Sequence, residues 1–307
     1  MKELKRKQSI LICLYVLAIL FLLVPFFSRG NSWIASLIIF LQIPAALLLL
    51  LGARALKARY RADYKKLAVP QSLKSIFSEY RYEPKAGLPV ETLAESGAVN
   101  RLLEQSDRIR TEDYIQARYH NIAFQQSDVS IDVKRHVRHN NLYFSILKGR
   151  WMVLDLNREF REKIQIIGID FFQDKENRAL QMHAVSTSGL FEDEHQYFSL
   201  ETGDELFEKR FRVFAFNDRE ARELLTPDFR THLMNVAARI DGKVMFCFAG
   251  KKLHVVINDR KSTFEPGKVF QLTDTNTVMQ NIRSEIRTST RIIDELSMDN
   301  DLFQPEE

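Results

Sequence analysis

The chain has 307 residues, enough for two average domains, with a formal net charge of +4 and a pI of about 8.9. Of its 44 basic and 40 acidic residues, eleven and two lie up to Lys66, which leaves 33 basic and 38 acidic residues beyond it. The larger part is therefore mildly acidic, at −5, which argues against nucleic acid as a partner. Cys13 and Cys247 lie in an apolar and a strand-like run, so a disulfide framework and a paired-cysteine metal site are excluded.

Two uncharged apolar segments follow the N-terminus. The first, ILICLYVLAILFLLVPFF, runs from 10 to 27, and the second, WIASLIIFLQIPAALLLLL, runs from 33 to 51. At about 1.5 Å per residue, a helix of either length crosses most of a hydrocarbon core. The link 28–32 is short enough only for a tight turn, so residues 1–69 are expected to hold a transmembrane helical hairpin. A cleaved signal peptide is the alternative for the first segment, but it lacks a small-x-small cleavage site.

Basic residues flank both outer ends of the hairpin, whereas the connecting turn holds only Arg29. The positive-inside rule therefore places both termini and the large domain on the cytoplasmic side of a cell inner membrane, as a multi-pass protein. A helix is expected to continue from Gly52 towards Pro70, because no breaker intervenes. Its basic residues act either as a topology signal on a solvated face or as contacts to anionic lipid head groups, and both interpretations can hold together. These membrane-surface candidates are Arg54, Lys57, Arg59, Arg61, Lys65 and Lys66.

The segment from 70 to 298 is expected to form one cytoplasmic α+β domain, since helix-like and strand-like stretches occur in blocks. We expect a mixed, mainly antiparallel sheet with packed helices. Apolar runs on both sides of Gly149 and of Gly250 predict two hairpins that turn at these glycines. The expected elements are helices over 72–82 and 99–105, strands over 113–133 and 164–172, and hairpins over 142–156 and 243–258.

The stretch FEKRFRVFAFNDREARELLTPDF, residues 207–229, predicts a strand that leads into a capped helix. Asn217 or Asp218 can cap the first helix, and Thr226 can cap a second helix that has Pro227 at its first position. A nucleophile elbow would need a small-x-Ser-x-small turn, which is not found here. We therefore interpret the stretch as a folding element and not as an active site.

The last helix is predicted by an apolar stripe with helical spacing. Ser289 fills one gap in this stripe, which is shorter than three heptads and indicates core packing more than a coiled coil. The acidic tail 299–307 is expected to be disordered. The stripe consists of Val278, Ile282, Ile286, Ile293 and Leu296.

Three features together resemble a known family: the run FEKRFRVFAFNDREARELLTPDFRTHL, the run ILKGRWMVLDLNREF at 146–160, and the paired N-terminal apolar segments. The chain is similar to the bacterial domain-of-unknown-function 3137 family from these segments to about Ile257. The resemblance implies a membrane-anchored bacterial protein with two transmembrane helices and a cytoplasmic domain. It implies no activity, cofactor or catalytic residue.

Candidate chemical groups are few. His136 and His139, with His120 in the preceding strand, have a spacing that metal sites use, but the basic residues around them would repel a cation. Glu192, Asp193 and Glu194 precede His195, where a polar loop is expected more than an acid–base or hard-cation cluster. Cys247 lies between phenylalanines and has no identifiable base. We therefore predict no catalytic residue, no cofactor and no metal, with His136, His139 and His195 as weak metal candidates.

The expected function is a non-catalytic interaction or regulatory module that binds membrane lipids through its hairpin and basic segment, and an unidentified protein partner through its domain. One alternative is a membrane-associated hydrolase or lipid-modifying enzyme that uses the segment Glu192–His195. A second alternative is an accessory subunit of a transporter or channel, which is supported only by Gln42 within the second apolar segment.

Overall fold

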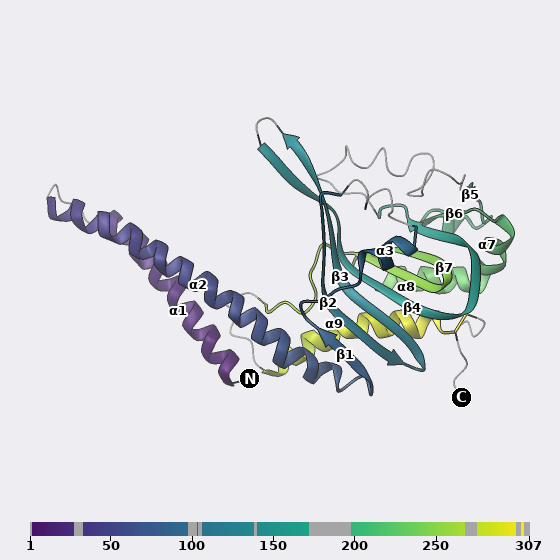
Figure 1. Cartoon of the computed structure of the whole chain (residues 1–307), viewed down its shortest axis with the longest axis horizontal. Helices are drawn as coiled ribbons and strands as arrows, with labels where there is room; N and C mark the ends of the chain where they lie inside the picture. Colours follow the sequence, from purple (N-terminus) through teal and green to yellow (C-terminus); the bar gives the residue numbers. More distant parts are fainter. Residues whose placement is uncertain are drawn as a thin grey trace. The chain divides into compact units, whose positions relative to one another are not determined.

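The computed structural model describes residues 2–27, 33–97, 103, 106–137, 140–171, 198–267, 275–298 and 302–303. These residues contain seven helices and a seven-stranded antiparallel sheet, which confirms the α+β class (Figure 1). They form two compact units. One comprises Met1–Leu73 and Phe264–Arg283, and the other comprises Lys74–Thr263 and Ser284–Glu307.

Two antiparallel helices, α1 (Lys2–Phe27) and α2 (Trp33–Leu73), make up most of the first unit (Figure 1). Lys7 Nζ donates a hydrogen bond to Asp63 Oδ2 at 2.5 Å and so fixes the register of the pair. Small side chains on the seam let the two backbones approach closely. The buried seam residues recur every seven positions, the spacing of knobs-into-holes packing: Leu4, Leu11 and Ala18 on α1, and Ala46, Ala53 and Tyr60 on α2.

The second helix continues through the basic segment, as the sequence predicts, but it ends at Leu73. The helix expected over 72–82 is therefore wrong, because Tyr80–Glu83 forms strand β1. Tyr80 and Tyr82 pair with Ala117 and Ile115 of the next strand, and aromatic residues favour this extended conformation. The helix expected over 99–105 falls almost entirely outside the described residues.

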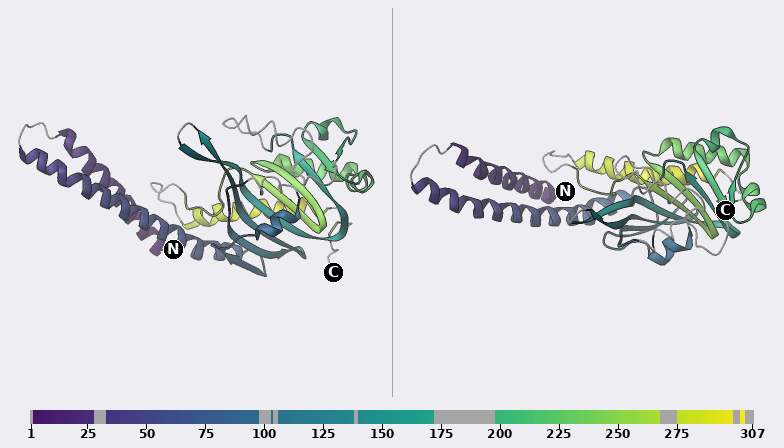
Figure 2. Two further views of the ribbon diagram at one scale, coloured as in Figure 1. Left: turned by 45° about the horizontal axis from the view of Figure 1, so that its top comes forward. Right: turned by 90° about the horizontal axis from the view of Figure 1, so that it is seen from above.

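The second unit contains the sheet, in the order β1-β2-β3-β4-β6-β5, with β7 paired to β4. Strand β4 pairs with β3 through its first half and with β6 near its end, while β7 follows much of its other edge. Figure 2 shows how β4 curves around the sheet. The remaining bounds are β2 (Arg108–Tyr119), β3 (Ile122–Val137), β4 (Asn140–Gly168), β5 (Phe198–Leu200), β6 (Phe211–Ala215) and β7 (Lys243–Asn258).

Both hairpins predicted at glycines are wrong, because β4 and β7 are each one continuous strand. A Cβ on Gly149 would lie 2.0 Å from the Ile257 carbonyl oxygen, so this glycine permits close approach of β7 and not a turn. Gly250 has φ +57°, a left-handed conformation, and lies where the register between β4 and β7 shifts. It bends the strand without reversing it.

Helices cover both faces of the sheet. Leu88 and Leu93, the latter on α3 (Val90–Glu95), belong to the same buried core as Val129, Trp151 and Val256. On the opposite face lie α8 (Pro227–Arg239) and the C-terminal part of α9 (Thr275–Leu296), as the views in Figure 2 show.

The strand and two caps predicted in the 207–229 stretch are confirmed. Asn217 accepts hydrogen bonds from Arg219 N and Glu220 N at the start of α7 (Asp218–Leu224). Thr226 Oγ1 accepts from Phe229 N at the start of α8, where Pro227 takes the first position.

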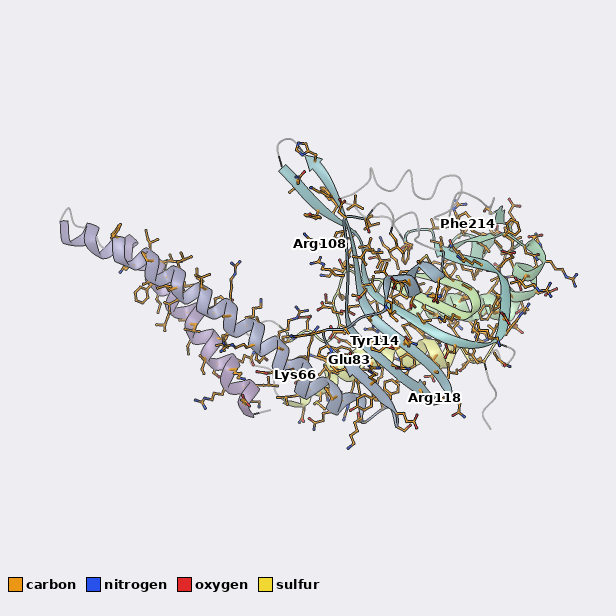
Figure 3. All side chains as sticks on the ribbon, viewed as in Figure 1. Lys66, Glu83, Arg108, Tyr114, Arg118 and Phe214 are labelled. Atoms are coloured by element: carbon orange, nitrogen blue, oxygen red, sulfur yellow. The ribbon has the colours of Figure 1, made fainter. Side chains whose placement is uncertain are left out.

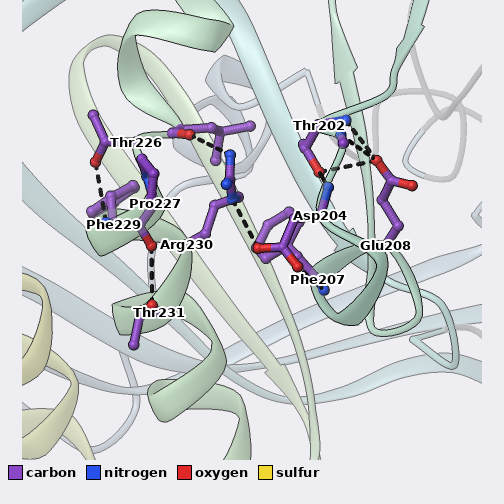
Figure 4. A network of polar contacts seen from close by, with 11 residues as sticks. Thr202, Asp204, Phe207, Glu208, Thr226, Pro227, Phe229, Arg230 and Thr231 are labelled. Carbon is purple, nitrogen blue, oxygen red and sulfur yellow. Dashed lines mark hydrogen bonds and ion pairs between the residues drawn. The ribbon is translucent and has the colours of Figure 1, made fainter.

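A further capped turn joins α8 to a short helix, α6 (Glu205–Glu208). Asp204 accepts from Phe207 N at the start of α6 and also from Arg230 Nε of α8, at 3.1 and 3.2 Å (Figure 4). Glu208 closes the same turn by accepting from Thr202 N at 2.6 Å. The two helices are therefore joined through one carboxylate.

The apolar stripe of α9 is buried as the sequence predicts, with Ser289 at 1% exposure. Beyond it, Leu302 and Phe303 lie within the stretch 299–307 for which the sequence predicts disorder. Both are buried, and Leu302 O accepts a hydrogen bond from Asn157 N at 2.8 Å. These two apolar side chains pack on the domain, whereas the acidic residues around them fall outside the described residues.

Candidate functional site

Three carboxylates gather where β2 and β3 lie side by side. Ligand atoms of Glu112, Asp113 and Asp128 all lie within 4.8 Å of one another. A β-bulge between Glu112 and Ile115 brings the two consecutive acids of β2 together here, and Asp113 takes φ +58°. Asp113 and Asp128 are buried at 1% and 6% exposure. We refer to the three carboxylates as the acidic cluster.

Neighbouring hydroxyl and amide groups already bind the acidic cluster. The Tyr82 hydroxyl donates to Asp113 Oδ1 at 2.7 Å. Thr263 donates twice to Asp128, from its backbone N to Oδ2 at 2.5 Å and from Oγ1 to Oδ1 at 2.6 Å. These contacts hold both aspartates in place.

A buried arginine lies beside the cluster on the adjacent strand. Arg150 of β4 lies directly opposite Asp128 in the β3–β4 register. Its guanidinium donates to Glu285 O at 3.0 Å and to Ser289 Oγ at 3.3 Å, and Ser289 donates to Gln126 Oε1 at 2.6 Å. Ser289, the polar gap in the apolar stripe, thus completes a hydrogen-bonded chain between α9 and the sheet.

This environment changes the protonation of Asp128. Burial, together with the nearby charge of Asp113, raises its pKa to about 7 against the hydrogen bonds from Thr263 and the charge of Arg150. Burial and the adjacent Asp113 also raise the pKa of the Tyr82 hydroxyl, which stays protonated and able to donate. The cluster can therefore exchange one proton near neutral pH. Its oxygen atoms are also of the type that Ca²⁺ and Mg²⁺ bind, although Arg150 opposes a cation.

On the α3 side of the sheet, two buried polar side chains have atoms that lack partners among the residues that the structure describes. Trp151 Nε1 donates to His254 Nδ1 at 3.2 Å, but His254 Nε2 has no hydrogen bond. Gln165, fully buried, leaves both its amide oxygen and its amide nitrogen unpaired. Each such group costs about 1–3 kcal/mol relative to a satisfied one. Burial lowers the pKa of His254 to about 3, so its ring is neutral.

A protein-family model supplies the decisive comparison. Residues 145–298 match the model described as "Protein of unknown function (DUF3137)". The chain belongs to the DUF3137 family. The matched range begins in β4 and ends after α9, so it confirms the predicted family but does not include the apolar N-terminal segments.

Individual proteins give no further information on the function of this DUF3137 member. No curated protein matches the chain. It is similar to a solved structure, the crystal structure of the mycobacterial trehalose monomycolate transport factor A, TtfA, with 8% identity and a TM-score of 0.34. This likeness covers 75% of this chain and 92% of that chain, and at such a score it carries no conclusion.

The weak metal candidates are not brought together within the described residues. His136 is exposed, and its Nδ1 lies 3.1 Å from Asn141 Oδ1, whereas His139 and the segment Glu192–His195 lie outside the described residues. Burial raises the pKa of the Cys247 thiol, which opposes formation of the nucleophilic thiolate.

The membrane-surface candidates divide into two sets. Arg61 Nε donates to Glu265 Oε1 at 2.8 Å, and Lys65 Nζ lies 3.3 Å from the same oxygen. Lys65 is nearly buried, so its charge already has a partner within the first unit. The other four are exposed: Arg54, Lys57, Arg59 and Lys66.

Sequence reasoning missed the acidic cluster and the Trp151–His254 pair. The adjacent acids at 112 and 113, inside a strand-like pattern, were a usable signal, because consecutive strand residues point to opposite faces unless a bulge intervenes. The position of Asp128 opposite them depends on the β2–β3 register, which the local sequence does not show.

Proposed function

We propose that this DUF3137 protein is a membrane-anchored cytoplasmic interaction or regulatory module without catalytic activity. A two-span helical hairpin holds it in a bacterial inner membrane, with both termini in the cytoplasm. A protein partner binds the domain, and lipids contact the hairpin and its exposed basic residues.

The observation that carries the proposal is the apolar exterior of α1 and α2. The segment Glu3–Leu23 of α1 is long and apolar enough to cross a membrane, and only 17% of its most apolar part is buried. Large apolar side chains on both helices are exposed, for example Leu20 at 53% and Leu48 at 70%. Water disfavours such a surface, whereas lipid accepts it.

Charge supports the orientation. The apolar surfaces of both helices give way to charged residues on the same side, where Lys7 of α1 pairs with Asp63 of α2. Arg54, Lys57 and Arg59 are exposed close to this end and can contact anionic head groups, at about 1 kcal/mol each. The two helices thus share one charged boundary, as a two-span hairpin requires.

Cysteine labelling tests the topology. In a Cys13→Ser background, Asn31→Cys between the two helices should react with a membrane-impermeant maleimide in intact cells, whereas Lys66→Cys should react only after permeabilisation. Cys247 is buried and gives little background. Labelling of Lys66→Cys in intact cells would contradict the orientation.

The interaction role is tested by photo-crosslinking the full-length protein in native membranes, followed by affinity recovery and mass spectrometry. One protein recovered in near-equal amount, and equally recovered when an unrelated anchor replaces the hairpin, would support the proposal. Dependence on the native hairpin would favour the transporter-subunit alternative. Turnover of a substrate by the purified protein would overturn the non-catalytic assignment.

A further inference from the structure

An open hollow of about 340 Å³ lies on the sheet, across β1, β2, β3 and β4. Two rows of side chains run across the strands at this place. Arg81, Gln116 and Gln125 lie opposite one another in the first row. Arg118 lies opposite Ala123 in the second row, and Asp155 follows Leu154, which pairs with Phe124. We refer to this feature as the sheet hollow.

The small side chain of Ala123 leaves space for the hollow, and it lies between two side chains of opposite charge. Arg118 of β2 and Asp155 of β4 lie on either side of it, two inter-strand spacings or roughly 10 Å apart at the backbone. Both side chains are exposed, and among the described residues no hydrogen bond or ion pair reaches the Asp155 carboxylate. The Arg118 guanidinium donates to Asn121 O at 3.2 Å, which leaves further N–H groups for a ligand.

Two other cations near the hollow already have partners, and Glu79 is a second carboxylate in its lining. Arg81 Nε donates to Glu83 Oε1 at 2.6 Å, and Lys252 Nζ lies 2.6 Å from Glu95 Oε2. Arg118 is therefore the cation most available to a ligand, and Asp155 is the carboxylate that lies across Ala123 from it. Partial desolvation raises the pKa of Asp155 overall, and the charges of Lys252 and Arg118 offset this only in part.

A neighbouring side-chain amide adds hydrogen-bond donors to the hollow. The Tyr114 hydroxyl donates to Gln125 Oε1 at 3.0 Å, so the Gln125 amide group offers its N–H donors to the hollow. Figure 3 labels Tyr114 and Arg118 on this part of the sheet. The donors of Arg118 on β2 and of Gln125 on β3 thus line the same hollow as the acceptor Asp155 on β4.

We propose that the sheet hollow binds a small zwitterion, with its phosphate or carboxylate group at Arg118 and its ammonium group at Asp155. The volume lies at the lower end of the range for small-molecule sites. Such a zwitterion could be a phosphoethanolamine head group or a free amino acid, which share this chemistry. The inference does not depend on the proposed interaction role, because it needs neither the partner nor the hairpin.

Isothermal titration tests the proposal on the full chain in a neutral maltoside detergent. The probes are glycerophosphoethanolamine and β-alanine as zwitterions, with inorganic phosphate and ethylamine as controls that each carry charge of only one sign. Saturable binding of one zwitterion, at least tenfold tighter than either single-charge probe, is expected. The preferred zwitterion then distinguishes the head-group source from the amino-acid source. Equal binding of phosphate and zwitterion would overturn the proposal in favour of a simple anion site.

Substitutions locate the binding. Arg118→Gln and Asp155→Asn should each weaken it at least tenfold, and Ala123→Leu should abolish it by filling the hollow without a change of charge. The matched controls Arg222→Gln and Asp218→Asn remove an exposed ion pair of α7 and should leave affinity unchanged. An unchanged urea midpoint shows that each variant is folded. Wild-type affinity in folded Ala123→Leu would contradict the site. A failure to crosslink a protein partner would contradict only the proposed interaction role and not this site.

Discussion

Trp151 Nε1 donates a hydrogen bond to His254 Nδ1 across 3.2 Å, and both side chains are completely buried. The rings are perpendicular, with centroids 6.2 Å apart. Because Nδ1 accepts this hydrogen bond, the single proton of the neutral ring lies on Nε2, which has no partner in the described part of the chain. Burial lowers the pKa of His254 to about 3, far below its ordinary 6.5.

His254 should make stability fall as pH falls. The unfolded chain takes up a proton at this residue below pH 6.5, whereas the folded chain does not until about pH 3. Within this window the free energy of unfolding should decrease by about 1.4 kcal/mol per pH unit from this residue. His254→Gln keeps an acceptor for Trp151 but does not titrate, so its stability should depend less on pH. Urea unfolding of the full chain in detergent from pH 7 to pH 4 measures the difference.

Trp151 itself can report this unfolding. The chain has two tryptophans, and Trp33→Phe removes the one in α2. Glu159→Gln is a matched control on the exposed surface and should keep the wild-type pH dependence. Identical pH slopes for wild type and His254→Gln would show that His254 titrates in the folded protein as it does in the unfolded chain.

Asp128 should act in the opposite direction. Its pKa of about 7 lies above the ordinary 3.8, so it contributes stability that is fully present below pH 3.8 and is lost as pH rises through about 7. Asp128→Asn replaces one of the two oxygen acceptors for Thr263 with an NH2 donor and should be less stable than wild type at pH 5. This deficit should shrink towards pH 8, by about 1.4 kcal/mol per pH unit across the window. A deficit that does not change between pH 5 and pH 8 would contradict the raised pKa.

The acidic cluster is expected to share a proton and not to hold a resident metal ion. Thr263 and Tyr82 already donate to the two aspartates, and Arg150 lies opposite Asp128. Dialysis of the full chain against EDTA should therefore leave its melting temperature unchanged at pH 7. A fall in melting temperature that Ca²⁺ or Mg²⁺ restores would instead identify a cation site.

Local rules predicted the parts of the fold that depend on local contacts. The caps at Asn217 and Thr226 were readable because each side-chain oxygen binds an amide two or three residues along. The stripe of α9 was readable because helical spacing alone gathers its apolar residues. In both cases the interacting groups are close in the sequence.

Long-range contacts explain the predictions that were wrong. Gly149 looked like a turn residue, but the reason for glycine is the Ile257 carbonyl of β7, which is distant in the sequence. The acidic cluster likewise forms only once the β2–β3 register and the bulge at Glu112 are set. Ser289 was recognised as a gap in the stripe, yet its role as acceptor for Arg150 needed the packed sheet.

Glu295 should stabilise the contact between α8 and α9. Its side chain is 3% exposed and accepts hydrogen bonds from Arg239 at 2.6 Å, Asn235 at 2.8 Å and His232 at 3.1 Å. Burial alone raises the pKa of Glu295, but these hydrogen bonds and the charge of Arg239 outweigh it, and the pKa is lowered. Its stabilisation is therefore present above pH 4.5 and lost as pH falls through the lowered pKa.

Glu295→Gln keeps the size of the side chain but removes its charge. We expect a loss of about 1–3 kcal/mol in the free energy of unfolding at pH 7, less than for a fully buried pair because Arg239 is 58% exposed. Urea unfolding at pH 7 and pH 4 measures it, and the loss should be smaller at pH 4. Glu201→Gln, at an exposed position, is the control. A loss equal to that of the control would rule out the contact as a stabilising element.

The two strand glycines should respond differently to alanine. A Cβ at position 149 would lie 2.0 Å from a backbone oxygen, so Gly149→Ala forces β7 away from β4 and should cost at least about 3 kcal/mol. Among the described residues no atom lies within 4 Å of a Cβ at position 250, so Gly250→Ala suffers from φ +57°, at about 1–2 kcal/mol. Two ordinary hairpin turns would instead give similar, small losses at both positions. Urea midpoints of the two variants therefore decide between continuous strands and the hairpins that the sequence predicts.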